Sequence, residues 1–338
     1  MSTALQQRRP RVAVLLGDAG GVGPEMGVKL LAQADVQATA DVLLIADPAV
    51  LAEGERVAGM KLPLAPVASA DVVAPADGRI AWLRQDVLQG RLPPRATSSA
   101  EAGLAALQAL QAASAAARQR QVQGIVFAPL NKHSLRLGGM HHEDELRYLQ
   151  EQFAVPGFVC EFNITGDLWT SRVTSHVPLR DVAQLITGPA VRDAVLIIQQ
   201  ALRRAGIQQP RIAVTGLNPH AGDGGSIGRE EIEVIEPVVR ALQAEGLDVR
   251  GPYSPDTVFI AARRGDFDAV VSMYHDQGQI AMKLMGFESG VTLHGGLPVP
   301  VTTPASGSAF DIAGQGKARI DGLRAAFDLN VRMATQLA

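Results

Sequence analysis

The chain has 338 residues, of which 47% are hydrophobic and 19% charged, and its formal net charge is −3. This composition excludes disorder, and a pI near 6.2 argues against nucleic acid as a partner. The single cysteine, Cys160, excludes an internal disulfide and a cysteine-based zinc site and predicts a reducing, cytoplasmic compartment. Since no apolar run approaches the roughly 18 residues that span a bilayer, we expect no membrane partner.

Short aliphatic runs alternate with helical stretches along the chain. The runs that predict strands are 11–17, 42–46, 124–128, 168–174, 211–216 and 268–273. The stretches that predict helices are 24–32, 98–118 with a capping box at Ser98 and Glu101, 189–204, and 230–245, which Pro237 should kink or split. This alternation predicts an α/β fold with one or two mostly parallel sheets.

Three histidines follow predicted strands: His176, His220 and His275. In an open α/β sheet, ligands bind at the carboxyl ends of the strands, where three imidazoles could hold one divalent metal. Each histidine could equally cap a strand. Lys283 follows in the same segment as His275, and its apolar neighbours predict partial burial, a lowered pKa and a role as proton carrier.

Two small, polar loops could admit a cofactor. Residues 17–25 join the first strand to the first helix, and their glycines permit close backbone approach to an anion. Their spacing matches neither the dinucleotide fingerprint nor the P-loop. Residues 302–308 form a similar loop near the C-terminus. These features predict a metal-assisted α/β enzyme, either a histidine-metal hydrolase or a metal-dependent dehydrogenase.

Five motifs, in the same order, resemble those of the 4-hydroxythreonine-4-phosphate dehydrogenase family of vitamin B6 biosynthesis. They are residues 17–25, 218–222, 251–257, 274–278 and 307–314. The resemblance implies an isocitrate/isopropylmalate dehydrogenase-like fold of two α/β domains with the active site in the cleft between them. We place residues 1–130 with about 303–338 in a domain with cofactor contacts. Residues of about 131–302 then carry the metal and substrate site and the dimer interface.

The resemblance also implies NAD (or NADP), a divalent metal (Zn, Mg, Mn or Co) and a homodimer with shared active sites. The family's metal ligands fall on His176, His220 and His275, and its catalytic lysine and acid fall on Lys283 and Asp256. The expected cofactor contacts are Gly17, Asp18, Ser306, Gly307, Ser308 and Asp311.

The substrate end departs from the family. Its Gly-His-Thr-Glu segment is replaced by Met-His-His-Glu-Asp-Glu-Leu at 140–146, its arginine by Val301 and its asparagine by Thr292. Valine cannot replace the bidentate phosphate contact of an arginine, and acids at 143–145 would repel a phosphate. We therefore expect an unphosphorylated substrate, bound by Lys283, Thr292, Val301 and His142. The alternative is that Arg136 or Arg147 compensates.

The leading hypothesis is an NAD- and divalent-metal-dependent dehydrogenase that oxidises a hydroxy acid with oxidative decarboxylation. Terephthalate cis-dihydrodiol is an example of such a small-molecule substrate. The alternative within the family is a genuine 4-hydroxythreonine-4-phosphate dehydrogenase of pyridoxal phosphate biosynthesis. A histidine-metal hydrolase, which would need no nicotinamide, and a non-catalytic small-molecule binding protein are alternatives of other classes.

Overall fold

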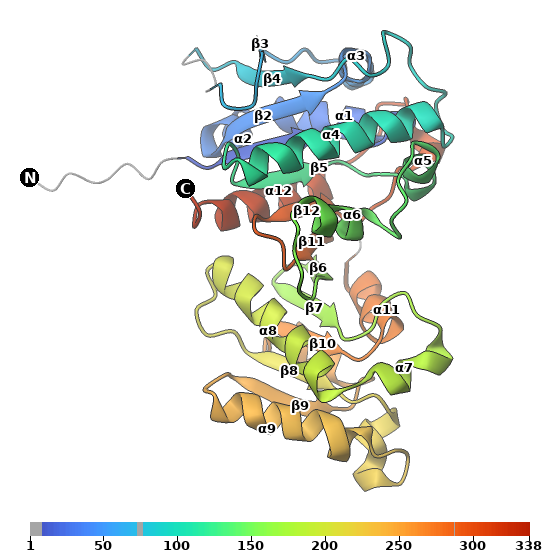
Figure 1. The fold of residues 1–338 in the computed structure, drawn as a ribbon, viewed down its shortest axis with the longest axis vertical. Helices are drawn as coiled ribbons and strands as arrows, with labels where there is room; N and C mark the ends of the chain where they lie inside the picture. Colours follow the sequence, from blue (N-terminus) through green and yellow to red (C-terminus); the bar gives the residue numbers. More distant parts are fainter. Residues whose placement is uncertain (1–8, 73–76, 287) are drawn as a thin grey trace, which may run out of the picture. The chain divides into compact units, whose positions relative to one another are not determined.

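The computed structural model describes residues 9–72, 77–286 and 288–338, and the chain divides into two compact units (Figure 1). The first unit comprises Met1–Val155 and Leu297–Ala338, and the second comprises Pro156–Gly296. The domain boundaries expected from the sequence were about residues 130 and 303. Within the described ranges, no helix is long and apolar enough to cross a membrane.

Among the residues that the structure describes, the first unit holds six strands, which run parallel in the order β3-β4-β2-β1-β5-β12. Their bounds are β1 Arg11–Leu15, β2 Asp41–Ala46, β3 Leu64–Val67, β4 Ile80–Arg84, β5 Gly124–Phe127 and β12 Val301–Pro304. The helices of this unit are α1 Gly23–Leu31, α2 Ala34–Thr39, α3 Pro48–Ala58, α4 Ala100–Arg118, α5 Lys132–Leu137, α6 Glu145–Gln152, the short 3₁₀ turn η3 Phe310–Ile312 and α12 Asp321–Ala334. All residues of β1 and β5 are buried, as expected for central strands covered by helices.

Helices pack on this sheet in two groups. Helix α12 contacts β12, β5 and β1 and also touches α1. Helix α4 contacts β1, β2 and β5, and helices α5 and α6 pack against α4. Alternate strand residues, such as Val12, Val14 and Val126, join Leu30 and Phe327 in one buried apolar cluster. Loops, rather than these helices, lie at the carboxyl ends of the strands.

Close packing of α4 against α5 explains why residues 131–155 belong to the first unit. A Cβ on Gly103 of α4 would lie 1.7 Å from the carbonyl oxygen of Ser134, and one on Gly138 would lie 2.3 Å from the amide of Leu104. Only glycines permit this approach. Asn131 begins α5, where its side chain accepts a hydrogen bond from the amide of Ser134.

The second unit has six strands in the order β11-β6-β7-β10-β8-β9. Their bounds are β6 Cys160–Thr165, β7 Leu168–Arg172, β8 Ile212–Thr215, β9 Val249–Tyr253, β10 Ala269–Ser272 and β11 Val291–Gly295. Strand β6 pairs antiparallel with β7 and β11, while β7, β10, β8 and β9 are parallel neighbours. The helical elements are α7 Leu179–Leu185, α8 Gly188–Arg204, the 3₁₀ segment η1 Pro219–Gly225, the π-helical turn η2 Glu231–Ile235, α9 Glu236–Ala244, α10 Val258–Arg263 and α11 His275–Gly286.

Both faces of this sheet are covered. Leu168, Ala213 and Val270 pack with Phe259 of α10 and Met282 of α11. Since successive strand residues point to opposite faces, Ser171 points the other way, and its hydroxyl donates to the Ala194 carbonyl of α8. The fold is thus α/β, as the alternating pattern predicted.

Two predicted helix features differ in detail. Ser99, rather than Ser98, begins α4, because its hydroxyl accepts the amide of Ala102 while the hydroxyl of Ser98 turns to Asn131. The break predicted at Pro237 is confirmed: the π-helical turn η2 ends at Ile235 and α9 begins with the proline in its first turn. A proline there has no amide hydrogen to donate, which is harmless at a helix start.

We predict that Gly103→Ala destabilises the protein. Alanine favours a helix over glycine by about 1 kcal/mol, but the added methyl would overlap a backbone oxygen that cannot move alone. Overpacking of this kind costs about 1–3 kcal/mol, so the melting temperature should fall. The control is Gln111→Ala on the exposed face of the same helix, which should leave the melting temperature nearly unchanged. An unchanged melting temperature for Gly103→Ala would contradict the described contact.

Candidate active site

Four polar side chains follow the four parallel strands of the second unit. His176 follows β7, His275 follows β10, His220 follows β8 and Asp256 follows β9. Because β7, β10, β8 and β9 are parallel neighbours, their carboxyl ends share one edge of the sheet. The sheet thus delivers three imidazoles and a carboxylate to the same edge.

His176 and His275 are neighbours at this edge, with ring centroids 5.9 Å apart. The Nδ1 of His275 lies 2.7 Å from the Asp276 carboxylate. A carboxylate only accepts, so Nδ1 carries the hydrogen and the Nε2 lone pair remains for a metal. Within one chain's described residues, however, His176, His220 and His275 do not form a group whose donor atoms all lie within 4.8 Å.

His220 lies in a glycine-rich turn with unusual backbone geometry. Five successive residues of η1, from His220 to Gly224, have φ between 44° and 80°. Non-glycine residues rarely adopt this left-handed conformation, and strain of this kind clusters at functional sites. Asp256 is close enough for the charge of His220 to act on it. A hydrogen bond from the Ser254 hydroxyl is the main cause that lowers the pKa of Asp256, and His220 adds to it, so the carboxylate stays ionised.

Two residues that the sequence did not single out hold the His220 turn. The Gln277 amide nitrogen donates to the carbonyls of Gly216 and Leu217 at 3.1 and 3.3 Å. The buried Glu231 carboxylate accepts the amides of Leu217 and Asn218 at 2.7 and 2.8 Å. Gln277 lies within the motif at 274–278 and Glu231 lies outside all five motifs, and one sequence does not show which backbone groups either side chain reaches.

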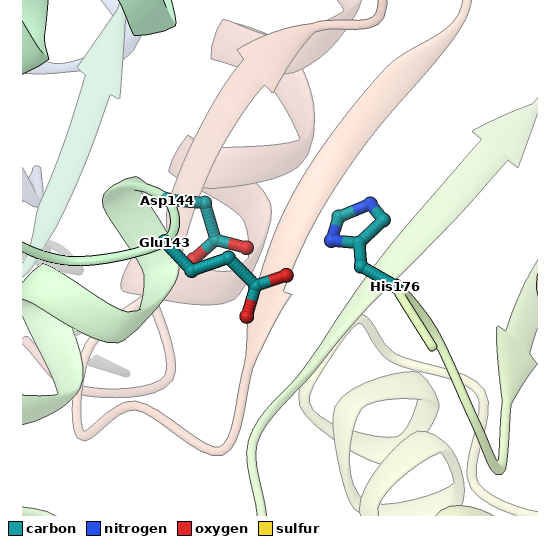
Figure 2. Close-up of side chains that lie close together, drawn as sticks. All are labelled: Glu143, Asp144 and His176. Atoms are coloured by element: carbon teal, nitrogen blue, oxygen red, sulfur yellow. The ribbon is translucent and has the colours of Figure 1, made fainter. Parts of the chain in front are cut away.

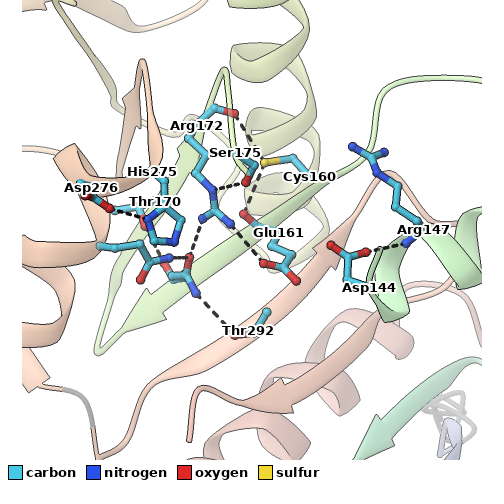
Figure 3. Close-up of polar contacts among 12 residues, drawn as sticks. Asp144, Arg147, Cys160, Glu161, Thr170, Arg172, Ser175, His275, Asp276 and Thr292 are labelled. Carbon is cyan, nitrogen blue, oxygen red and sulfur yellow. Dashed lines mark hydrogen bonds and ion pairs between the residues drawn. The ribbon is translucent and has the colours of Figure 1, made fainter. Parts of the chain in front are cut away.

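A polar network includes Ser175, the residue that precedes His176 in the sequence (Figure 3). The Arg172 guanidinium, on β7, donates to Ser175 at 2.6 Å, to Asn163 at 2.9 Å and to Glu161 at 3.1 Å. Asn163 in turn donates to the hydroxyl of Thr292 on β11 and accepts from Gln279 of α11. The network links Thr292, expected at the substrate end, to the segment that leads into His176.

Lys283 lies on α11, eight residues beyond His275, and its environment differs from our expectation. We expected its apolar neighbours to bury it, but Lys283 is exposed and Leu284 and Ile280 are 84% and 60% exposed. Met282 is buried in the core, and the half-buried Ala281 and Met285 pack against the same apolar cluster. In an amphipathic helix, adjacent apolar residues face different ways, so their presence in the sequence did not imply a buried lysine.

The remaining residues expected at the substrate end lie in the first unit. Val301 is completely buried in β12 and pairs with Ile125. His142 is within 2.5 Å of the Glu151 carboxylate and packs edge-on against Tyr148. Asp144 is buried and caps α6 by accepting the amide of Arg147.

Figure 2 shows Glu143 and Asp144 before α6, and His176 after β7. The two acids belong to the first unit and the histidine to the second, so we assign no common site to them.

The expected cofactor loops meet at the carboxyl edge of the first unit's sheet. The amide of Val22 donates to the carbonyl of Ser308 at 3.0 Å, and a Cβ on Gly21 would lie 2.7 Å from the same oxygen. This brings residues 17–22 against 306–308. Gly17 has φ 74°, and Asp18 is buried, with burial as the main cause that raises its pKa. Asp311 and Gly307 are exposed and Ser306 is half-buried.

The donor sets suit a metal and a cofactor. Imidazole nitrogens and an ionised carboxylate are ligands that divalent transition metals accept. In the first unit, the buried Ser308 hydroxyl has no hydrogen-bond partner among the described residues, and a polar ligand group at the loop would satisfy it.

Comparison with known proteins identifies the family. The sequence profile of the family described as "Pyridoxal phosphate biosynthetic protein PdxA" matches residues 38–330. A protein of Pseudomonas aeruginosa called "Putative 4-hydroxythreonine-4-phosphate dehydrogenase 2" is 47% identical over 97% of this chain and 98% of its own. A "D-threonate 4-phosphate dehydrogenase" of Cupriavidus necator is 39% identical over 97% of this chain and 98% of its own.

Solved structures agree with the predicted fold. A 4-hydroxythreonine-4-phosphate dehydrogenase from Klebsiella pneumoniae matches with a TM-score of 0.83 at 32% identity, covering 99% of this chain and 100% of that one. A terephthalate 1,2-cis-dihydrodiol dehydrogenase from Burkholderia xenovorans matches with 0.66 at 31% identity, over 94% and 96%. A β-decarboxylating dehydrogenase from Thermococcus kodakarensis, 15% identical with a TM-score of 0.51 over 93% and 80%, shares the fold. The chain is therefore a dehydrogenase that belongs to the PdxA family.

Proposed function

We propose that this protein is an NAD- and divalent-metal-dependent dehydrogenase that oxidises the hydroxyl group of a phosphorylated hydroxy acid, such as 4-hydroxythreonine 4-phosphate or D-threonate 4-phosphate. The observation that carries the proposal is the delivery of three histidines and Asp256 to one sheet edge in a chain of this family. The unphosphorylated substrate that we first favoured has weaker support, because the most similar relatives are named for phosphorylated substrates.

His176, His220, His275 and the ionised Asp256 would hold the metal. A divalent metal, when bound, supplies the positive charge that makes a substrate hydroxyl easier to deprotonate. Lys283, on the same helix as His275, is our candidate to carry that proton away, with Asp256 as the alternative. Asp276 keeps the His275 ring in the tautomer that presents Nε2.

The loops around Gly17 and Ser308 would hold the nicotinamide cofactor. The two loops approach each other closely, and the Ser308 hydroxyl has no hydrogen-bond partner among the described residues. These loops could therefore bind a polar ligand group without the glycine fingerprint of dinucleotide-binding proteins. NAD, when bound there, would accept the hydride that the alcohol carbon loses, and the hydroxyl proton would pass to Lys283 or Asp256, which leaves a ketone. Where the substrate carries a carboxylate β to that ketone, we propose that loss of carbon dioxide follows. We also propose a reducing, cytoplasmic compartment, because a sequence with a single cysteine, Cys160, has no internal disulfide to maintain.

The proposal is tested by NADH formation at 340 nm with each candidate substrate and added Mn²⁺ or Zn²⁺. We expect turnover of 4-phosphohydroxy-L-threonine or D-threonate 4-phosphate, loss of turnover with a chelator, and loss in His220→Ala but not in His133→Ala, whose histidine is exposed on α5. Turnover of terephthalate cis-dihydrodiol alone would contradict the phosphorylated substrate. Metal-dependent hydrolysis without NAD would favour the hydrolase alternative.

A phosphorylated substrate needs a cation in place of the family's arginine, since Val301 is buried. Of the two arginines considered from the sequence, Arg147 donates to Gln150 on its own helix, whereas Arg136 lies on the exposed face of α5. We propose that Arg136 contributes to phosphate binding.

We predict that Arg136→Met raises KM for the phosphorylated substrate at least tenfold with a smaller change in kcat, because it removes a charge-assisted contact of about 1.5–3 kcal/mol. Steady-state kinetics measure this. Arg147→Met, the same change one helix further on, is the control and should alter KM less than twofold. Equal effects of the two variants would contradict the assignment.

We also propose a homodimer with shared active sites. The second unit exposes large apolar side chains, among them Ile280 and Leu284, which lie one turn apart on the same helix as His275 and Lys283. A partner subunit that covers α11 would bury these side chains. Its histidines could then complete a metal site together with those of the first subunit.

We predict that the double substitution Ile280→Glu with Leu284→Glu converts a dimer into a monomer, because it puts two charges into an apolar interface. Light scattering coupled to size-exclusion chromatography measures the mass. Leu337→Glu, at an exposed apolar residue of the first unit, is the control and should leave the mass unchanged. A dimer that survives the double substitution would show that α11 is not at the interface.

A further inference from the structure

The backbone of residues 216–218, just before His220, is hydrogen-bonded on both of its sides. Its carbonyls at 216 and 217 accept from the Gln277 side chain, and its amides at 217 and 218 donate to the Glu231 carboxylate. The amide of Gly216 also donates to the carbonyl of Tyr253 at the end of β9. These hydrogen bonds, all made within the second unit, hold the backbone of residues 216–218 in place.

Gln277 also contacts the segment that leads into His275. Its Oε1 accepts the amide of Met273 at 2.8 Å and the hydroxyl of Thr215 at 3.2 Å. Met273 follows β10 and leads into His275, while Thr215 ends β8. The amide group therefore uses both its donors and both its acceptor positions, and it joins the carboxyl ends of two adjacent strands.

Glu231 occupies a space that two glycines leave open. A Cβ on Gly216 would lie 2.8 Å from its Oε1, and one on Gly222 would lie 2.6 Å from its Oε2. Glu231 is 2% exposed, and its Oε2 accepts from the Asn218 side chain at 3.0 Å. A buried carboxylate that receives several N–H groups is held firmly in place.

The left-handed turn of His220 requires such support. Left-handed geometry costs a non-glycine residue about 1–2 kcal/mol, and His220, Ala221 and Asp223 all adopt it. A turn of this kind persists only where its surroundings over-determine it. Gln277 and Glu231 supply the contacts that do so.

We infer that Gln277 and Glu231 are positioning residues that fix the His220 turn relative to His275 and so set the geometry of the metal site. Both act through the backbone of residues 216–218. The inference rests on the proposed metal-binding function. Loss of a group that orients ligands in this way lowers metal affinity about 10–100-fold.

The test is titration of the 338-residue chain with Co²⁺ alone. Calorimetry and the visible absorption of bound Co²⁺ measure binding during the titration. Gln277→Met keeps the side-chain length and removes all four hydrogen bonds, and we expect Co²⁺ affinity to fall at least tenfold with a changed absorption spectrum. Glu231→Gln keeps an acceptor for the two amides, so we expect a smaller loss.

The matched control is Gln243→Met. Gln243 makes the same kind of bond, from its side-chain amide to the carbonyl of Val249, but at the opposite end of the sheet, where β9 begins. We expect its Co²⁺ affinity and spectrum to equal those of the parent, even where its melting temperature falls as far as that of Gln277→Met.

Three outcomes separate the possibilities. A parent protein that binds no Co²⁺ overturns the proposed metal site and the inference with it. A parent that binds Co²⁺, with Gln277→Met binding equally tightly, overturns the inference alone. If Gln277→Met does not fold, Gln277→Glu is the test variant. Its carboxylate keeps one oxygen that accepts hydrogen bonds, but its second oxygen replaces the amide nitrogen that donates to the carbonyls of Gly216 and Leu217. Unchanged Co²⁺ affinity in that variant overturns the inference.

Discussion

Parallel strand order is the constraint on which both candidate sites depend. In the second unit, β7, β10, β8 and β9 run the same way, so the residues that follow them meet at one edge. In the first unit, β1, β5 and β12 do the same for the loops around Gly17 and Ser308. The chemistry therefore needs no local motif: Val22 and Ser308 meet because β1 and β12 flank the same strand, β5.

This geometry explains what could be predicted from the sequence. Buried strands such as β1 and β10 have continuous aliphatic runs, and each proposed metal histidine follows such a run or a strand-like stretch, so both were visible. Edge strands such as β3, with Leu-Ala-Pro-Val, have no clear period and were missed. Gln277 and Glu231 were missed because their importance depends on which backbone atoms they reach, and that is a property of the folded loop.

The direction of side chains explains why the substrate end differs from what the sequence predicted. Acids at 143–145 were expected to repel a phosphate, yet Asp144 is committed to capping α6. Val301 was expected to line an apolar substrate site, yet it lies in the core of the first unit. Lys283 was expected to be buried by its neighbours, yet it is exposed together with Ile280 and Leu284. In each case the residue type was read correctly, and its direction, which depends on helix phase or sheet position, was not available from one sequence.

We propose that His176, His220 and His275 together bind the metal of this dehydrogenase. Anomalous diffraction from crystals grown with Zn²⁺ locates the ion. We expect an anomalous peak about 2.0–2.1 Å from a ring nitrogen of each of the three histidines, whether these come from one chain or from two. A zinc peak that excludes His220, or a protein that binds no zinc at this edge of the sheet, would contradict it.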